Sequence, residues 1–191
     1  MDLVQIMKSI TRRTALKGPL LGLVGVSAPS IAEPTSSRPH VGYPYLDEEI
    51  VFEVISRSHF NLEGVKALVE KRPELANATW GRFGDFESAV EAASHVGRRD
   101  IVQYLLSKGA KPNILTYASL GAYDAVKNMI ECSPGIQTTL GPHGISLLRH
   151  ARAALRMQDK MSRSEIESSK QLIGYLESLG NANGEQYDDI S

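Results

Sequence analysis

Histidine, carboxylate and thiol side chains are the groups that could hold a metal ion or transfer a proton, and this sequence spaces them sparsely. The 191 residues include five histidines and one cysteine, so no disulfide pair and no cysteine-built zinc site can form within the chain. No glycine-rich phosphate loop, Gly-x-Ser-x-Gly elbow or His-Glu-x-x-His metal helix occurs. We therefore expect no enzyme, no metal and no cofactor.

Two of the histidines, His59 and His95, are expected at equivalent, exposed positions just before two short helices end. Neighbouring helices lie about 8–10 Å apart, so a metal shared by the two rings is sterically conceivable. No carboxylate or thiolate joins them by pattern, and surface or partner contact is the preferred interpretation. Cys132 has no base motif beside it, which predicts an inert, largely buried thiol.

A second group of residues with binding chemistry is basic. Side chains at spacings of three and four are predicted to line one helical face, namely Arg149, Arg152, Arg156, Lys160 and Arg163. An anionic partner could use such a stripe, but a charge run is more often a solvated surface.

The segment 80–86 concentrates aromatic residues in a chain that is only 6% aromatic. It holds the single tryptophan and two of the four phenylalanines, and aromatic and arginine side chains are enriched at binding hot spots. The alternative is that Trp80 or Phe86 folds back to cover the first helices.

The elements that must position these residues recur along the chain. Within 88–113, Ala92 and Ala93 allow two helices to approach closely, and Gly97 ends the first helix. Apolar residues in the second half of that segment recur at helical spacing. Similar pairs are expected over 48–59 with 62–71, 115–120 with 121–130, and 141–151 with 171–180.

Residues 88–113 resemble the ankyrin repeat without a gap, although 88–91 read Ser-Ala-Val-Glu where Thr-Pro-Leu-His is usual. The resemblance extends over 46–183 and implies an all-α solenoid of about four helix pairs with short hairpin connections. The last pair has an insertion of about 13 residues, expected around 160–169 and partly as an extension of the preceding helix. An unrelated helical bundle is the alternative.

Ankyrin stacks bind other proteins through their hairpin tips and through the concave face of their first helices. The resemblance therefore implies a non-catalytic protein-interaction module, expected to be a monomer, with an unidentified protein partner. Its contact residues would be Ser58, His59, Trp80, Arg82, Phe83, Glu87, His95, Val96, Ser119, Leu120 and Ile145. The alternatives are a companion of an exported redox enzyme, or a metal-binding protein or enzyme on a repeat scaffold.

The first 32 residues are typical of an export signal. Arg12 and Arg13 precede a weakly apolar stretch, and small residues stand at the two positions that a signal peptidase recognises. The segment resembles a bacterial twin-arginine signal, with Ala15 where phenylalanine is usual. We predict cleavage after Ala32, a flexible linker over 33–45, a disordered tail over 184–191, and a periplasmic or secreted protein.

Composition bounds the remaining classes. The formal net charge of −1 provides no attraction to nucleic acid at the level of the whole chain. No apolar run reaches the roughly 20 residues of a membrane-spanning helix, so we expect no stable span after cleavage. With 42% hydrophobic and 23% charged residues, the chain can bury an ordinary core.

Overall fold

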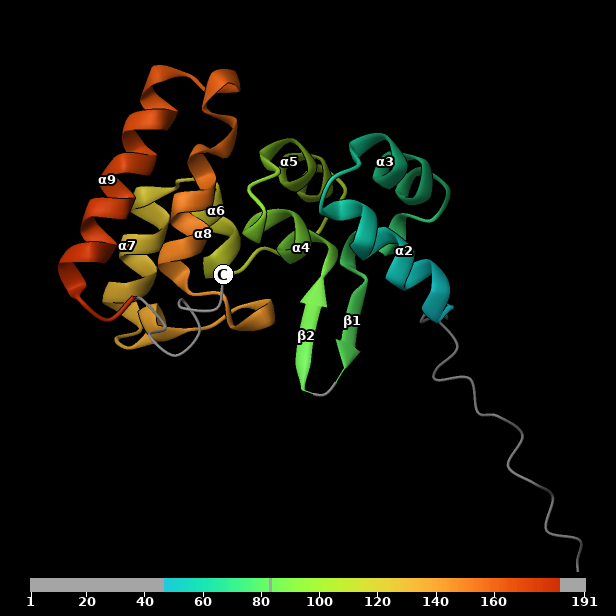
Figure 1. The fold of residues 1–191 in the computed structure, drawn as a ribbon, viewed down its shortest axis with the longest axis horizontal. Coiled ribbons are helices and arrows are strands. Elements are labelled where there is room, and N and C mark those ends of the chain that lie inside the picture. The colour runs from blue at the N-terminus through green and yellow to red at the C-terminus, as the bar shows by residue number, and fades with distance from the viewer. Residues whose placement is uncertain (1–46, 83, 183–191) are drawn as a thin grey trace, which may run out of the picture. The chain divides into compact units, whose positions relative to one another are not determined.

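The computed structural model describes residues 47–82 and 84–182, which all belong to one compact unit, Pro39–Ser191 (Figure 1). These residues are mostly helical, with one small sheet, and the prediction of a helical protein is confirmed at that level. The predictions of a signal, a linker and a C-terminal tail concern residues outside the described ranges. Among the described helices, none has both the length and the hydropathy needed to cross a membrane.

The helices follow one another as four pairs. They are α2 (Glu48–Ser58) with α3 (Leu62–Lys71), α4 (Ala89–His95) with α5 (Arg99–Ser107), α6 (Ile114–Ser119) with α7 (Tyr123–Cys132), and α8 (Leu147–Ala153) with α9 (Arg163–Leu179). Short 3-10 segments are η1 (Pro73–Asn77), η2 (Ile136–Thr138), η3 (Pro142–Gly144) and η4 (Ala154–Lys160). The two strands are β1 (Thr79–Arg82) and β2 (Asp85–Ser88).

The first helices of the pairs pack in a row, because α2 contacts α4, α4 contacts α6 and α6 contacts α8. Among the second helices, α3 lies against α5 and α7 against α9. Two apolar clusters fill the unit, one around Val54 and Ile101 and the other around Leu147 and Leu172. Helices of six or seven residues are unstable alone in water, so this packing is what holds α4, α6 and α8.

The turn between α4 and α5 approaches α8 closely. Gly97 has a φ of 70°, and a Cβ there would lie 2.3 Å from the carbonyl oxygen of Ala153. Arg99, at the start of α5, donates to the carbonyl of Leu120 at 2.8 Å and to Glu165 at 2.6 Å. The second helix pair therefore contacts both the third and the fourth pair.

The strands form an antiparallel hairpin that leads directly into α4. Trp80 pairs with Glu87 and Gly81 with Phe86 in its register. Ser88 ends β2 and also caps α4 through a capping box, in which its hydroxyl accepts from the Glu91 backbone while the Glu91 carboxylate accepts from the Ser88 backbone. This cap fixes Glu87 immediately before the first turn of α4.

The extra residues of the fourth pair lie only partly where the sequence predicted them. The segment η4 extends α8 as expected, but most of 160–169 belongs to α9 rather than to the connection. Met157 has non-helical angles inside η4, so the predicted single basic face is interrupted. Arg149, Arg152 and Arg156 share one hollow of about 300 Å³, whereas Lys160 ends η4 and Arg163 begins α9.

The prediction of a buried thiol at Cys132 is wrong. Cys132 is the last residue of α7 and is exposed, because the buried side of that helix is formed by Val126 and Ile130.

Candidate functional site

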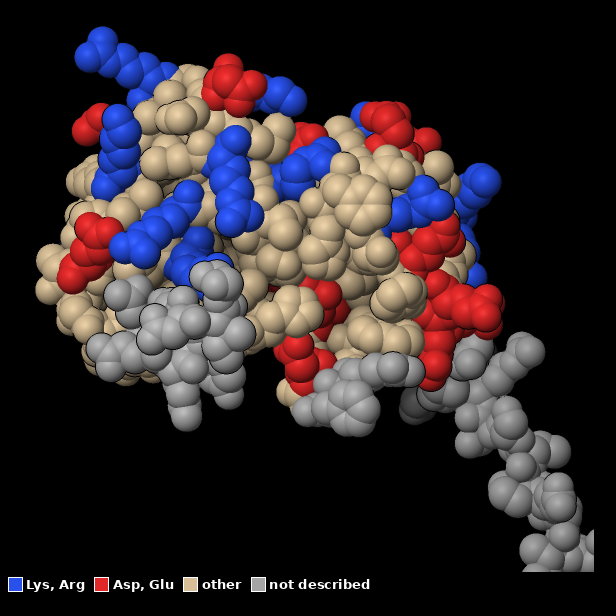
Figure 2. Space-filling model, in the orientation of Figure 1, with Lys and Arg blue, Asp and Glu red and all other residues tan. Residues whose placement is uncertain are grey.

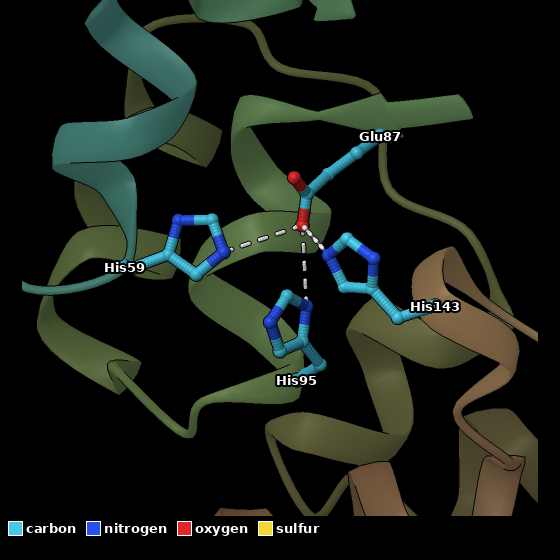
Figure 3. A group of neighbouring side chains, drawn as sticks. All are labelled: His59, Glu87, His95 and His143. Atoms are coloured by element: carbon cyan, nitrogen blue, oxygen red, sulfur yellow. Dashed lines mark ion pairs between the residues drawn. The ribbon is translucent and has the colours of Figure 1, made fainter. Parts of the chain in front are cut away.

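Three imidazole rings converge on one carboxylate oxygen at the base of the hairpin (Figure 3). His59 Nε2 and His95 Nδ1 each lie 3.4 Å from Glu87 Oε1, and His143 Nε2 lies 3.5 Å from the same oxygen. One ligand-type atom from each of the four residues lies within 4.8 Å of all the others. We call these four residues the histidine cluster.

Each member comes from a different element. His59 follows the last residue of α2, Glu87 lies in β2, His95 ends α4, and His143 is in η3 before α8. The contacts of α2 with α4 and of β2 with η3 bring these elements together. His143 adopts the left-handed backbone conformation, with φ 60° and ψ 20°, which is uncommon for a residue other than glycine.

Burial differs sharply across the cluster. The side chains of His95 and Glu87 are 7% and 10% exposed, whereas that of His143 is 54% exposed. The prediction that His59 and His95 are both exposed is wrong for His95, because the hairpin and η3 close over it. The cluster is therefore open to solvent on the His143 side.

Two polar atoms at the centre of the cluster are unsatisfied. Within the described residues, Glu87 Oε1 and His95 Nδ1 are buried and have no hydrogen-bond partner. The three contacts of 3.4–3.5 Å to Glu87 Oε1 lack hydrogen-bond geometry. Leaving a buried polar atom unpaired costs about 1–3 kcal/mol, so this centre is destabilising as it stands.

The protonation states follow from burial and from the shared carboxylate. Burial lowers the pKa of His95 to about 4, so the ring is neutral at pH 7. Glu87 beside it raises the pKa of His59 against the effect of burial. Burial acts to raise the pKa of Glu87, but the contact with His59 and the neighbouring imidazoles outweigh it, and the Glu87 pKa is lowered.

Three of the four cluster residues were predicted from the sequence, but as separate partner contacts. A metal between His59 and His95 was not expected because no carboxylate joined them by pattern, and that reason is wrong since Glu87 lies between the two rings. His143 was missed, because it is far away in sequence. One signal in the sequence could have indicated His143. Like Glu87, it lies shortly before the first helix of a later pair.

The other predicted contact residues divide by burial. Ser58 and Ser119 are buried and donate their hydroxyls to helix carbonyls, so they offer no surface to a partner, contrary to the prediction. Trp80 is half-buried and meets the Phe52 ring edge to face at 5.4 Å. Three more of the predicted contact residues are half-buried, namely Val96, Leu120 and Ile145. Arg82 contributes backbone to β1, and Phe83 lies outside the described residues.

One exposed aromatic surface was not predicted. Phe52 of α2 and Phe60, which lies two residues after the end of that helix, line a hollow of about 370 Å³. Phe86 is 67% exposed and lines a second hollow with Leu140 and Pro142.

Comparison with known proteins adds no family to this geometry. No family model matches the sequence, and no curated protein and no solved structure is significantly similar to it.

Proposed function

We propose that this chain is a non-catalytic protein-binding module built from stacked helix pairs of the ankyrin type. The support is the row of first helices, the second helices beside it, and a hairpin that projects from between the first two pairs (Figure 1). Such a row has no single enclosed core pocket, and it offers extended surface instead.

The observation that carries the proposal is the set of exposed aromatic side chains around the hairpin. Phe52 is 55% exposed and contacts Trp80, while Phe86 is 67% exposed on the opposite face of the strand pair. We call these three residues the aromatic surface. An aromatic residue on each face of a projecting hairpin is suited to insertion between two parts of a partner, since both faces become buried.

The charge around the aromatic surface restricts the chemical class of the partner. Exposed acidic residues lie beside it, at Glu48 and Glu49 of α2 and at Asp85 of β2. Figure 2 shows acidic side chains near the hairpin and α2, and basic side chains gathered elsewhere on that face. The partner that fits is therefore a protein segment that combines apolar and basic side chains, because complementary charge steers association and disfavours wrong partners.

The experiment places a photo-reactive amino acid at position 86 of the full chain, in the host that expresses it. Crosslinked proteins are recovered and identified by mass spectrometry. The matched control carries the same amino acid at position 103, since Gln103 is exposed on α5 and far from the hairpin in sequence. A protein crosslinked from position 86 and absent from the position 103 sample is the expected partner.

Affinity for that partner is then measured with purified proteins. Trp80→Ala and Phe86→Ala are each expected to weaken binding by about 10-fold or more, because truncating a hot-spot aromatic costs about 2 kcal/mol. Gln103→Ala, a change at an exposed residue of α5 outside the aromatic surface, is the control. Equal affinity for the wild type and both hairpin variants would reject the aromatic surface as the contact.

Export through the twin-arginine route, with action in the periplasm, belongs to the same proposal. It is supported by Arg12, Arg13 and the small residues up to Ala32 in the sequence. N-terminal sequencing of protein recovered from the periplasm tests it. The expected first residue is Glu33, and an intact Met1 or Met7 end on that material would contradict cleavage.

A further inference from the structure

We propose that the histidine cluster, His59, Glu87, His95 and His143, is a binding site for one transition-metal ion, with Zn²⁺ as the best fit. This site does not depend on the proposed protein-binding function. Imidazole nitrogen and carboxylate oxygen are both ordinary zinc ligands, and four protein donors complete the usual coordination number. Thiolate ligands are not needed for such a set.

The spacing of the donors matches the ion. Zinc lies about 2.0–2.2 Å from nitrogen and oxygen ligands, so neighbouring corners of its tetrahedron are about 3.3–3.6 Å apart. The three distances from imidazole nitrogen to Glu87 Oε1 are 3.4, 3.4 and 3.5 Å. No donor pair exceeds 4.8 Å. Ring movements of about 1 Å therefore bring all four donors into zinc geometry.

A central cation also resolves the unpaired atoms. Glu87 Oε1 and His95 Nδ1 are buried without a hydrogen-bond partner among the described residues. Protonating all three rings around one carboxylate would place several like charges within a few ångströms of one another. A divalent cation at the centre would accept the lone pairs of the carboxylate oxygen and of the three ring nitrogens together. No two of these lone pairs would then face each other unpaired.

The outer ring nitrogens are held as they are in zinc proteins. His59 Nδ1 lies 3.0 Å from the carbonyl oxygen of Ile55, which can only accept, so Nδ1 carries the proton and Nε2 is free to bind metal. His143 Nδ1 lies 3.1 Å from Asp85 Oδ2, and the backbone N–H of His143 also donates to Asp85. A carbonyl or carboxylate behind a ligating histidine fixes its tautomer and raises its basicity.

The donor set favours zinc over the hard cations. Magnesium and calcium prefer six or more oxygen ligands, and this cluster contributes one carboxylate oxygen among three nitrogens. Copper and nickel also accept imidazole, so the host's metal supply takes part in the choice. The neighbouring His150 is not part of the site, because it is not among the residues whose ligand atoms lie within 4.8 Å of one another, and its ring centre lies 6.4 Å from that of His95.

The bound ion would join the end of α2, strand β2, the end of α4 and segment η3. These parts span residues 59 to 143, so one ion links the first two helix pairs to the segment that precedes the fourth. Because the ion binds only the folded arrangement, zinc is expected to raise the thermal midpoint of unfolding, and the rise should grow with the logarithm of the free zinc concentration.

The test uses the full chain without a histidine tag, freed of metal with a chelator. Zinc is then added in a titration calorimeter, and cobalt is added separately as a spectroscopic probe. We expect one zinc per chain, a higher thermal midpoint, and the intense visible absorption of tetrahedral cobalt. X-ray absorption at the zinc edge should report four nitrogen or oxygen neighbours and no sulfur.

Variants assign the site. His143→Ala removes a ligand that is 54% exposed, so the core is left intact, and should weaken zinc binding by at least about 100-fold. Asp85→Asn removes only the support behind His143 and should weaken it by about 10–100-fold. Glu49→Gln, an exposed acid of α2 outside the cluster, is the control and should bind like the wild type.

Far-UV circular dichroism checks that each variant is folded, and Glu87→Gln replaces His143→Ala if the latter is not. Three outcomes would overturn the proposal. The first is no zinc above background in the wild-type chain. The second is zinc affinity unchanged by the folded ligand variant, whether His143→Ala or Glu87→Gln, and the third is a sulfur neighbour at the zinc edge. Unchanged affinity would mean adventitious surface binding.

Discussion

The close approach of Gly97 to α8 leads to a prediction that a matched pair of variants can test. A Cβ at position 97 would lie 2.3 Å from the carbonyl oxygen of Ala153 and 3.0 Å from Cδ of Arg156. The carbonyl belongs to a helix and cannot turn aside, so Gly97→Ala must push the α4–α5 turn away from α8.

Gly109 supplies the control for this change. Its φ of 86° is also left-handed, but a Cβ there would have open space around it among the described residues. Alanine in this backbone region costs about 1–2 kcal/mol, and this cost is common to both positions. Crowding adds about 1–3 kcal/mol, and this second cost falls on position 97 alone.

The assay is urea unfolding followed by far-UV circular dichroism. We expect Gly97→Ala to lose about 2–5 kcal/mol of the free energy of unfolding and Gly109→Ala about 1–2 kcal/mol. With a urea slope of about 1–3 kcal/mol per molar, the midpoints should separate clearly. Equal losses for the two variants would refute the contact between the α4–α5 turn and α8.

Three further predictions follow from single side chains. Ser162 and Arg99 lower the pKa of Glu165 to about 2, so its stabilisation is complete above its unfolded value of 4.5 and is lost as pH falls toward 2. Glu165→Gln, which keeps the capping shape, should cost less than about 1 kcal/mol at pH 7 and clearly less at pH 2, where the folded carboxylate is partly protonated, compared by urea unfolding at both values; an equal cost at the two pH values would contradict the assignment. Ser88→Ala should cost about 1 kcal/mol by losing the α4 capping box, with Ser107→Ala, an exposed serine near the end of α5, as the comparison that should cost less. Cys132 is exposed and should react with a thiol reagent in the native protein as fast as in urea; protection in the native state would contradict its exposure.

Local features of the sequence determined most of the helices. The apolar spacing within 62–71 predicted α3 at its observed bounds, and the resemblance implied short hairpin connections, of which β1 and β2 form one. Ser88 with Glu91 is a start signal that reads directly from the chain. These features depend on residues three or four apart, or on adjacent turns, which is why periodicity and capping reveal them.

What the sequence could not determine is which distant side chains meet. The histidine cluster joins positions 59, 87, 95 and 143, and nothing in their spacing sets the distance between them. That distance depends on how far each helix pair rotates and shifts against the next, and on the left-handed turn at His143, which places its ring over Glu87.

Which side chains are buried also depends on how the helix pairs pack. Cys132 was predicted to be buried and His95 to be exposed, and the structure reverses both. Each residue type fits either environment, since a helix end can be covered or left open by elements far along the chain. By itself the sequence determined the helices and the hairpin, and only the packing of the pairs decided which polar side chains became a site.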